Sequence, residues 1–381
     1  MSFHFCSVIP AKAGIQRLTS GAKTRDTGLR RYDDKKGRGF AVAALLLMGI
    51  VLNVQAQELP VVCPASRPRP ALMAPLAAKT RLLDITQAGS RLVAVGQQGV
   101  IVISDDGKQW RQSPSPVSQM LNRVRFTDEK TGWITGYDGV ILKTSDGGDS
   151  WALKNFNPAA RALFDVLFLD SRNAIAVGGY GLYLTTSDGG ETWTEREHEI
   201  RTLGLHLISI MKLGDGSLFI AGEKGFMARS ADKGEHWQFL DGPYTGSYFG
   251  ALPRGEKGVL LFGLRGNVYT TADVSQSPAM DPSSWDEFAR ETITDPEKLA
   301  KTGWQFMPSP IRESFFGGDW VAEGQAVLVG VNGTTVRTDF ASGKLVAMDT
   351  PPAETLGDVI SYQGRLIAVG RRGVQDLGET P

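Results

Sequence analysis

Four aspartates recur in a D-x-G-x-x-W pattern, and the spacing of the copies limits the chemistry that they could do. The copies contain Asp105 and Trp110, Asp146 and Trp151, Asp188 and Trp193, and Asp232 and Trp237. Carboxylates act as general acids, nucleophiles or metal ligands where several of them converge. Successive copies are 41, 42 and 44 residues apart, so each lies in its own structural unit. We therefore interpret them as structural: Asp accepts turn N–H groups, Gly permits positive φ, and Trp covers the unit's outer edge.

No other signature of catalysis or metal binding accompanies these turns. Beyond the N-terminal region the histidines are His198, His206 and His236, and no H-E-x-x-H or C-x-x-C pair is present. There is also no G-x-S-x-G and no phosphate-binding glycine loop that leads into a helix. These patterns are the ones that zinc enzymes, serine hydrolases and nucleotide-binding proteins need. The sequence therefore predicts no catalytic residue, no cofactor and no metal ion.

A second repeat, G-x-x-G, runs in register with the first and reveals the architecture. Seven copies recur in register, at Gly96–Gly99, Gly136–Gly139, Gly178–Gly181, Gly222–Gly225, Gly263–Gly266, Gly330–Gly333 and Gly370–Gly373. The spacings are 40, 42, 44, 41, 67 and 40 residues. A unit of about forty residues is too small to bury its own hydrophobic face and must stack against copies of itself.

Each unit is predicted to be an antiparallel four-stranded sheet. The third unit shows four short apolar or β-branched runs, 164–170, 174–178, 182–186 and 192–195, separated by turn residues. No long periodic segment between the units could supply a crossover helix. Seven such units predict an all-β fold, a seven-bladed β-propeller over residues 71–381. The last unit lacks an outer strand, so we expect residues 71–78 to supply it and close the ring.

The wide spacing between the fifth and sixth steps predicts an insertion of about residues 275–314 between blades five and six. Asp295 followed by Pro296 has the pattern of an N-cap and first helical position, so a short helix is predicted over 295–301. The insertion is either a simple loop extension or a contact surface for a partner.

The paired motifs resemble a known family. The turns match the Asp-box, or sialidase-type, repeat, and the stretches Thr135–Trp151 and Val177–Trp193 resemble the photosystem II assembly and stability factors and their non-photosynthetic bacterial relatives. This resemblance covers essentially all of residues 82–373. It implies an exported, non-enzymatic, seven-bladed propeller that binds a membrane-protein complex or its assembly intermediate. The alternative is a carbohydrate-active hydrolase or lectin on a sialidase-like propeller, although the F/Y-R-I-P signature of sialidases is missing.

The N-terminal residues 1–56 read as a doubtful start region followed by a signal peptide. Basic residues around Lys35 precede an apolar run from Phe40 to Leu52 and a small-x-Ala site at Ala56. The run is shorter than the roughly 20 residues of a membrane span, so we expect cleavage near Ala56, a linker over residues 57–70 and a periplasmic location. Cys63 is the one cysteine after this site, so no internal disulfide is expected.

The strand order assigns the G-x-x-G steps and the links between blades to one face of the ring and the Asp-box turns to the other. On the first face we hypothesise a partner-binding set of cationic and aromatic residues, because both kinds are enriched at protein interfaces. Its members lie between the two glycines of their steps: Tyr137, Tyr180, Lys224, Arg265, Arg371 and Arg372. The formal net charge of zero argues against nucleic-acid binding. We expect a monomer without a small-molecule substrate.

Overall fold

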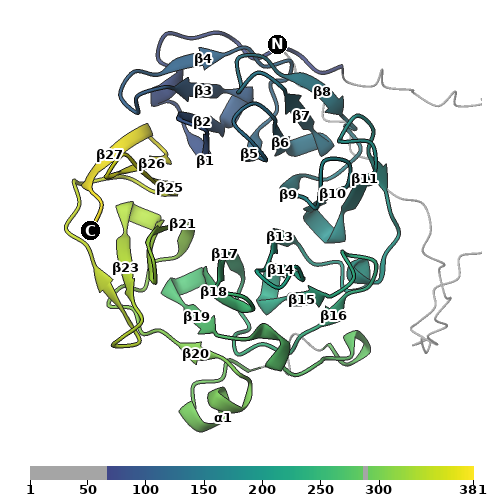
Figure 1. Ribbon diagram of the computed structural model, residues 1–381, viewed down its shortest axis with the longest axis vertical. Helices are drawn as coiled ribbons and strands as arrows, with labels where there is room; N and C mark the ends of the chain where they lie inside the picture. Colours follow the sequence, from purple (N-terminus) through teal and green to yellow (C-terminus); the bar gives the residue numbers. More distant parts are fainter. Residues whose placement is uncertain (1–66, 286–290) are drawn as a thin grey trace, which may run out of the picture. The chain divides into compact units, whose positions relative to one another are not determined.

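Seven antiparallel sheets follow one another along the chain and are arranged as a ring in the computed structural model (Figure 1). The structure describes residues 67–285 and 291–381. The predicted signal peptide, its cleavage site and both cysteines therefore lie outside the described residues. The ring is a seven-bladed β-propeller, as the repeat predicted.

Six blades have four strands each and the seventh has three. The first three blades are β1 (Leu82–Ala88), β2 (Arg91–Gly96), β3 (Ile101–Ser104) and β4 (Arg111–Ser113); β5 (Leu121–Phe126), β6 (Gly132–Gly136), β7 (Ile141–Thr144) and β8 (Ala152–Asn155); and β9 (Leu163–Phe168), β10 (Ala174–Gly178), β11 (Tyr183–Thr186) and β12 (Thr194–Glu195). The next two are β13 (Leu207–Lys212), β14 (Leu218–Gly222), β15 (Met227–Ser230) and β16 (Gln238–Phe239); and β17 (Tyr248–Arg254), β18 (Gly258–Gly263), β19 (Val268–Thr271) and β20 (Gln305–Phe306). The last two are β21 (Phe315–Ala322), β22 (Gln325–Gly330), β23 (Thr335–Asp339) and β24 (Lys344–Ala347); and β25 (Leu356–Tyr362), β26 (Arg365–Gly370) and β27 (Gly373–Glu379).

The helices of the described residues are short. The single α-helix among them is α1 (Pro296–Lys301). Six one-turn helices coincide with G-x-x-G steps: η2 (Gln97–Gly99), η3 (Tyr137–Gly139), η4 (Gly179–Gly181), η6 (Glu223–Gly225), η7 (Leu264–Gly266) and η10 (Val331–Gly333). The others are η1 (Ala77–Lys79), η5 (Glu199–Arg201), η8 (Val274–Gln276) and η9 (Pro282–Ser284). No helix in the described ranges is long and apolar enough to cross a membrane.

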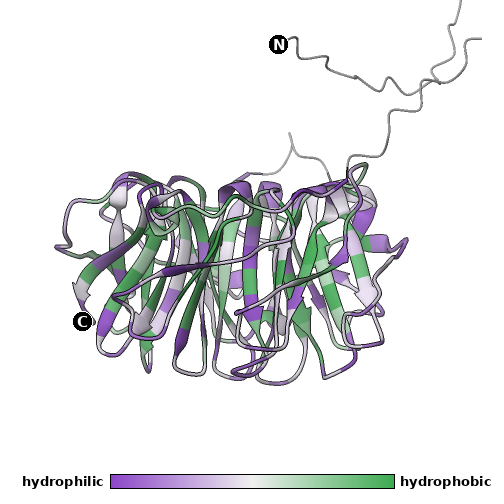
Figure 2. Ribbon diagram, turned by 90° about the horizontal axis from the view of Figure 1, so that it is seen from above, coloured by the Kyte–Doolittle hydropathy of each residue, from purple (hydrophilic) through white to green (hydrophobic). Residues whose placement is uncertain are grey.

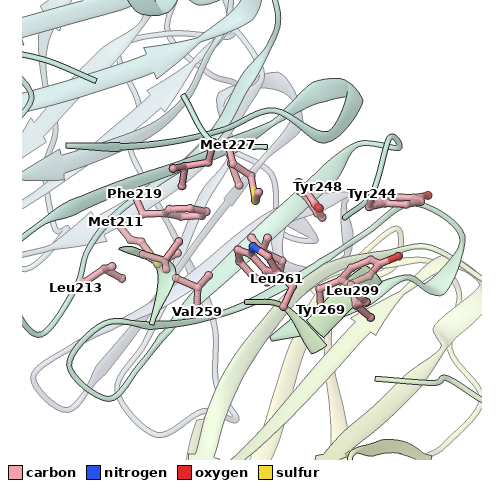
Figure 3. Packing of buried hydrophobic residues seen from close by; sticks show 14 residues of the cluster. Met211, Leu213, Phe219, Met227, Tyr244, Tyr248, Val259, Leu261, Tyr269 and Leu299 are labelled. Atoms are coloured by element: carbon pink, nitrogen blue, oxygen red, sulfur yellow. The ribbon is translucent and has the colours of Figure 1, made fainter. Parts of the chain in front are cut away.

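The hydrophobic core lies between neighbouring blades. The second strand of each blade is buried along nearly its whole length, because both faces of each sheet are covered by other sheets. Between blades four and five, Phe219 and Met227 pack against Tyr248, Leu261 and Tyr269 (Figure 3). In side view, hydrophobic residues concentrate in the strands and hydrophilic residues at the loops of the two faces (Figure 2).

The G-x-x-G step fastens the turn after the second strand to the start of the first strand. In blade one the N–H of Gln97 donates to the carbonyl of Arg81 at 3.1 Å, and every other blade repeats this bond. A Cβ on Gly96 would lie 2.3 Å from that carbonyl oxygen, and a Cβ on Gly99, whose φ is 71°, would lie 1.9 Å from the carbonyl oxygen of Val117. Close approach and backbone conformation together explain the two glycines.

The predicted N-terminal closing strand is wrong, because residues 71–78 do not pair with β27. The segment instead follows the outer strand of blade one, where the N–H of Ala71 donates to Ser115 O at 3.0 Å. Pro70 and Pro75 lack the N–H groups that a sheet strand needs. The end of the segment, η1, packs against β27 without pairing with it. A side chain also joins blade seven to blade one: the hydroxyl of Tyr362 donates to Ser90 O at 2.7 Å.

The insertion lies inside blade five, not between blades five and six. It connects β19 to the two-residue strand β20 and thus replaces the Asp-box turn. It runs along the outer edge of blade four, where the N–H of Met280 donates to Phe239 O at 2.9 Å. The predicted helix is confirmed as α1, and the Asp295 side chain accepts the N–H groups of Glu297 and Lys298.

Candidate docking site in the axial cavity

The Asp-box aspartates hold their own turns. In blade three Thr186 Oγ1 donates to Asp188 Oδ1 at 2.7 Å, and the backbone N–H and hydroxyl of Thr192 donate to the same carboxylate. The bonds from Thr192 keep the pKa of Asp188 well below its ordinary value. Asp146 and Asp232 accept corresponding bonds in blades two and four. These carboxylates are occupied by the scaffold.

The sequence-based choice of Asp105 was wrong for the first turn, which is one residue shorter than the others. Asp106 occupies the capping position there and accepts the N–H groups of Lys108 and Gln109 at 2.8 Å each. Asp105 instead forms an ion pair with Arg91 Nε at 2.6 Å. The two adjacent aspartates could be distinguished only by the length of the turn.

The four Asp-box tryptophans pack toward the preceding blade and do not cover the outer edge of their own. Trp151 lies between blades one and two, and Trp237 between blades three and four; both are buried. Trp193 borders the seam between blades two and three, and Trp110 borders the seam between blades seven and one. The Asp-box therefore joins blades as well as stabilising a turn.

Every first strand carries a β-bulge near its start. In blade one Leu82 pairs with Gly96 and Asp84 with Val95, so Leu83 is left between them without a partner. The same register shift occurs in all seven blades. The bulged residues are Leu83, Asn122, Phe164, Ile208, Phe249, Phe316 and Gly357. Bulges commonly re-aim side chains at functional sites.

The seven bulged residues all line one cavity on the axis of the ring, with a volume of about 830 Å³. We call this space the axial cavity. It also contacts Gln97 and Arg371 of G-x-x-G steps, so it belongs to that face. The rings of Phe249 and Phe316 lie 5.2 Å apart. The wall of the axial cavity thus combines apolar side chains with a cationic border of Lys79, Arg81 and Arg371. No Asp or Glu of the described residues lines this cavity.

One residue further along the first strands, buried charges tie neighbouring blades together. Asp84 accepts the N–H of Val124 in the next blade at 2.7 Å and pairs with Arg123 Nη1 at 2.8 Å. Asp165 lies on the other side of Arg123, 3.6 Å from its Nε. Burial alone would lower the pKa of Arg123, but the charges of these two carboxylates raise it above its ordinary value. Arg123 is therefore engaged by the scaffold.

A buried carboxyl of blade seven also lies near both of its neighbours, blades six and one. Asp358 accepts the N–H of Gly318 in blade six at 3.1 Å. Burial, reinforced by the charge of Asp84, raises the pKa of Asp358 well above its ordinary value. Asp358 therefore joins blade seven to blade six in a position next to Asp84 of blade one.

The residues proposed from the sequence for partner binding are spread around the face, and one of them borders the axial cavity. Arg371 does so, and it shares Glu354 with Arg372 at 3.2 Å and 2.8 Å. The remaining four, Tyr137, Tyr180, Lys224 and Arg265, lie in their separate turns and do not line the cavity.

Tyr180, Lys224 and Arg265 are held at the tips of their turns in the left-handed backbone region, with φ between 54° and 59°. Tyr180 is 54% exposed, and the guanidinium of Arg161 lies 4.5 Å from the centre of its ring. His206 approaches the same ring edge-on at 4.5 Å. This tyrosine is already stacked by its neighbours, and only its outer side is free for a partner.

Sequence reasoning missed the bulged residues and the cations Lys79 and Arg81. A signal was available, because each first strand starts with a large buried residue followed by the bulged one, as in Leu163–Phe164 and Phe315–Phe316. The bulged positions vary from Phe to Gly, so they do not form a repeat that can be recognised by residue type. The bulged positions can be recognised in the sequence only by their shared position relative to the G-x-x-G step.

The fold and the cavity define a class: a seven-bladed propeller with a cavity on its axis that is lined by aromatic, aliphatic and polar side chains together with several cations. The sequence family described as photosynthesis system II assembly factor YCF48 matches residues 156–280. The photosystem II stability/assembly factor HCF136, chloroplastic, of Cyanidioschyzon merolae is 31% identical over 87 residues, which are 21% of this chain and 20% of that protein.

Solved structures show the same likeness over nearly the whole ring. YCF48 from Cyanidioschyzon merolae has a TM-score of 0.59 at 16% identity, covering 80% of this chain and 97% of that chain. A structure of YCF48 bound to D1 peptide has a TM-score of 0.56 at 14% identity, covering 83% and 98%. The predicted resemblance to photosystem II assembly factor-like propellers is confirmed, whereas the matched sequence spans about a fifth of the curated relative.

Proposed function

We propose that this chain is an exported, non-catalytic scaffold that binds an extramembrane segment of a membrane protein, or of its assembly intermediate, in the axial cavity. The observation that carries the proposal is the convergence of all seven bulged residues on one cavity at the G-x-x-G face. The first strands of a propeller surround its axis, so equivalent positions converge there, and bulges commonly re-aim such side chains at functional sites.

The chemistry of the cavity favours a peptide with an apolar side chain and a nearby carboxylate. Phe164, Phe249 and Phe316 offer aromatic surface for the apolar group. Lys79 and Arg81 at the border offer positive charge for an acidic side chain or a chain terminus. The solved YCF48 with D1 peptide is a precedent for peptide binding by a similar propeller. By analogy, the partner here is a segment of a membrane protein.

Binding without catalysis fits the placement of the acidic groups. Glycoside hydrolysis needs a pair of carboxyl groups at the substrate, and the described lining of the axial cavity contains none. The carboxylates deeper on the axis, such as Asp84 and Asp165, accept backbone N–H groups and pair with Arg123. The Asp-box carboxylates serve their turns on the opposite face.

Export is the part of the proposal that rests on the N-terminal sequence. The basic region, the apolar run from Phe40 to Leu52 and the site at Ala56 predict cleavage that leaves Gln57 as the first residue. Intact-mass measurement of periplasmic protein checks this directly. A mature species that still contains the Phe40–Leu52 segment would show that the segment is an anchor.

Partner binding is tested by capture from native membranes. Tagged protein is cross-linked and purified, and the captured membrane protein is identified by mass spectrometry. The double variant Phe249→Ser/Phe316→Ser removes the aromatic wall of the cavity and is expected to abolish capture, because both rings are half-buried and contact each other. The matched control is Phe306→Ser, which removes a partly exposed aromatic ring on the outer strand of blade five, outside the cavity. Equal capture by both variants would reject the axial cavity as the site.

A further inference from the structure

The segment before the first blade combines positive charge with exposed apolar side chains. Residues 67–81, which we call the basic–apolar segment, contain four cations and no acidic residue. The cations are Arg67, Arg69, Lys79 and Arg81, and none of them forms an ion pair within the described part of the chain.

The apolar side chains of this segment are among the most exposed of the described residues. Leu72 is 87% exposed, Met73 58% and Leu76 63%, and these are three of the six large hydrophobic residues that are exposed there. A contiguous exposed apolar patch next to charged residues marks an interaction surface, because leaving it in water is unfavourable. This patch is separate from the axial cavity, which none of the three lines.

The backbone of the segment is fixed to the ring, so the exposure is built into the fold. Gln112 in β4 holds it on both sides: its Nε2 donates to Leu72 O at 2.9 Å, and its Oε1 accepts the N–H of Ala74 at 2.7 Å. Ala77 is buried in the seam between blades one and seven. Residues 71–76 therefore lie along the outer side of blade one (Figure 1), where the side chains of Leu72, Met73 and Leu76 are exposed.

We propose that the basic–apolar segment docks the propeller on a lipid bilayer that carries anionic headgroups. Amphipathic surfaces that bind membranes place large apolar residues at the headgroup boundary and flank them with Lys and Arg, which attract anionic lipids. Trp110, Arg111 and Met73 border a shallow cavity of about 380 Å³ beside the segment, and tryptophan is a favoured residue at the membrane interface.

A bilayer fits this surface better than a protein partner does. The apolar side chains are exposed beside blade one and closely follow the cations Arg67 and Arg69 in sequence, whereas Lys79 and Arg81 at the end of the segment line the axial cavity. A lipid surface accepts such an arrangement without shape complementarity, whereas a protein interface needs a matching acidic and apolar surface. The docking keeps the propeller close to membrane proteins but does not depend on what occupies the axial cavity.

The test is co-sedimentation of the full chain, as isolated from cells, with vesicles of equal parts phosphatidylglycerol and phosphatidylcholine. We expect binding that weakens with added salt and is weak on pure phosphatidylcholine vesicles. The variant Leu72→Ser/Met73→Ser/Leu76→Ser is expected to lose binding at least about tenfold. The variant Arg67→Gln/Arg69→Gln is expected to bind roughly fivefold more weakly for each cation removed. Phe306→Ser is the matched control, since it removes a partly exposed aromatic residue from a different part of the ring.

The outcomes separate the possibilities. Loss of vesicle binding in the triple variant, with unchanged circular dichroism and unchanged thermal unfolding, supports the proposal. Absence of vesicle binding by the unmodified chain would overturn it, and so would binding that survives the triple variant, since another part of the chain would then carry it. Vesicle binding retained while capture of a protein partner is lost would assign the segment to a protein interface instead.

Discussion

Tyr362 provides a test of how a ring without a closing strand holds together. Its side chain extends from blade seven to blade one, where its hydroxyl lies 2.7 Å from Ser90 O and 3.1 Å from Asp105 O. The residue is 5% exposed and shares a hydrophobic cluster with Leu92 and Ile367. Since blade seven has three strands, we expect this seam to depend on side-chain packing more than a seam in a ring closed by a strand would.

The expected cost of substitution follows from these contacts. Tyr362→Phe keeps the ring and removes the hydrogen bond, which costs about 0.5–1.5 kcal/mol. Tyr362→Ala also leaves a cavity at the seam, and replacing a large buried aromatic residue by Ala costs about 3–5 kcal/mol. Comparison of the two variants separates the contribution of the hydroxyl group to stability from that of the packed aromatic ring.

The assay is equilibrium urea unfolding followed by tryptophan fluorescence, with thermal unfolding as a second measurement. Tyr137→Ala serves as the control, because its side chain is 47% exposed and surface substitutions usually change stability by about 0.5 kcal/mol or less. If Tyr362→Ala costs no more than Tyr137→Ala, blade seven is held to blade one by other contacts, and the proposed role of Tyr362 in ring closure is refuted.

Three further predictions concern charge. Asp358→Asn is expected to stabilise the protein near neutral pH, because burial raises the folded-state pKa of Asp358 above 3.8. The stability of the folded state that is present while this carboxyl is neutral is lost as pH rises and the carboxyl ionises. Thermal unfolding should therefore show that the stability gained by Asp358→Asn shrinks toward about pH 4. Asp188→Ala is expected to lower the melting temperature but leave partner capture by the folded protein intact; specific loss of capture would overturn its structural role. Arg265→Glu/Arg371→Glu/Arg372→Glu is expected to weaken capture in pull-downs, more strongly at low than at high salt; unchanged, salt-insensitive capture would exclude these arginines.

The parts of the fold that could be predicted are those encoded within one repeat. The turn of Asp188 is built from residues within a few positions of one another, and the G-x-x-G step is required by backbone contacts inside one blade. The ring closure is different, because Tyr362 and Ser90 are 272 residues apart in sequence. Nothing in either local sequence indicates that contact, and a strand was predicted in its place.

The insertion was misplaced for a related reason. Strand β20 consists of Gln305 and Phe306 alone, which is too short to be recognised by an alternating pattern. It is a strand because Phe306 pairs with Tyr269 across the sheet, and Tyr269 lies before the insertion in sequence. Without that pairing the fourth strand of blade five cannot be separated from the loop that precedes it.

The binding residues were harder to predict than the fold because the residues that maintain each blade are different from those that line the axial cavity. The glycines of each step and the buried first residue of each first strand maintain the blade, and they recur as residue types. The bulged residue that follows lines the axial cavity and differs from blade to blade while the ladder pairing is kept, although at Gly357 a Cβ would lie 2.7 Å from Leu83 O. A sequence repeat reveals the positions at which the blades keep the same residue type, whereas specificity for a partner depends on the positions at which they differ. The six bulged positions that carry a side chain are therefore where propellers of this fold can differ in what they bind while the ring stays the same.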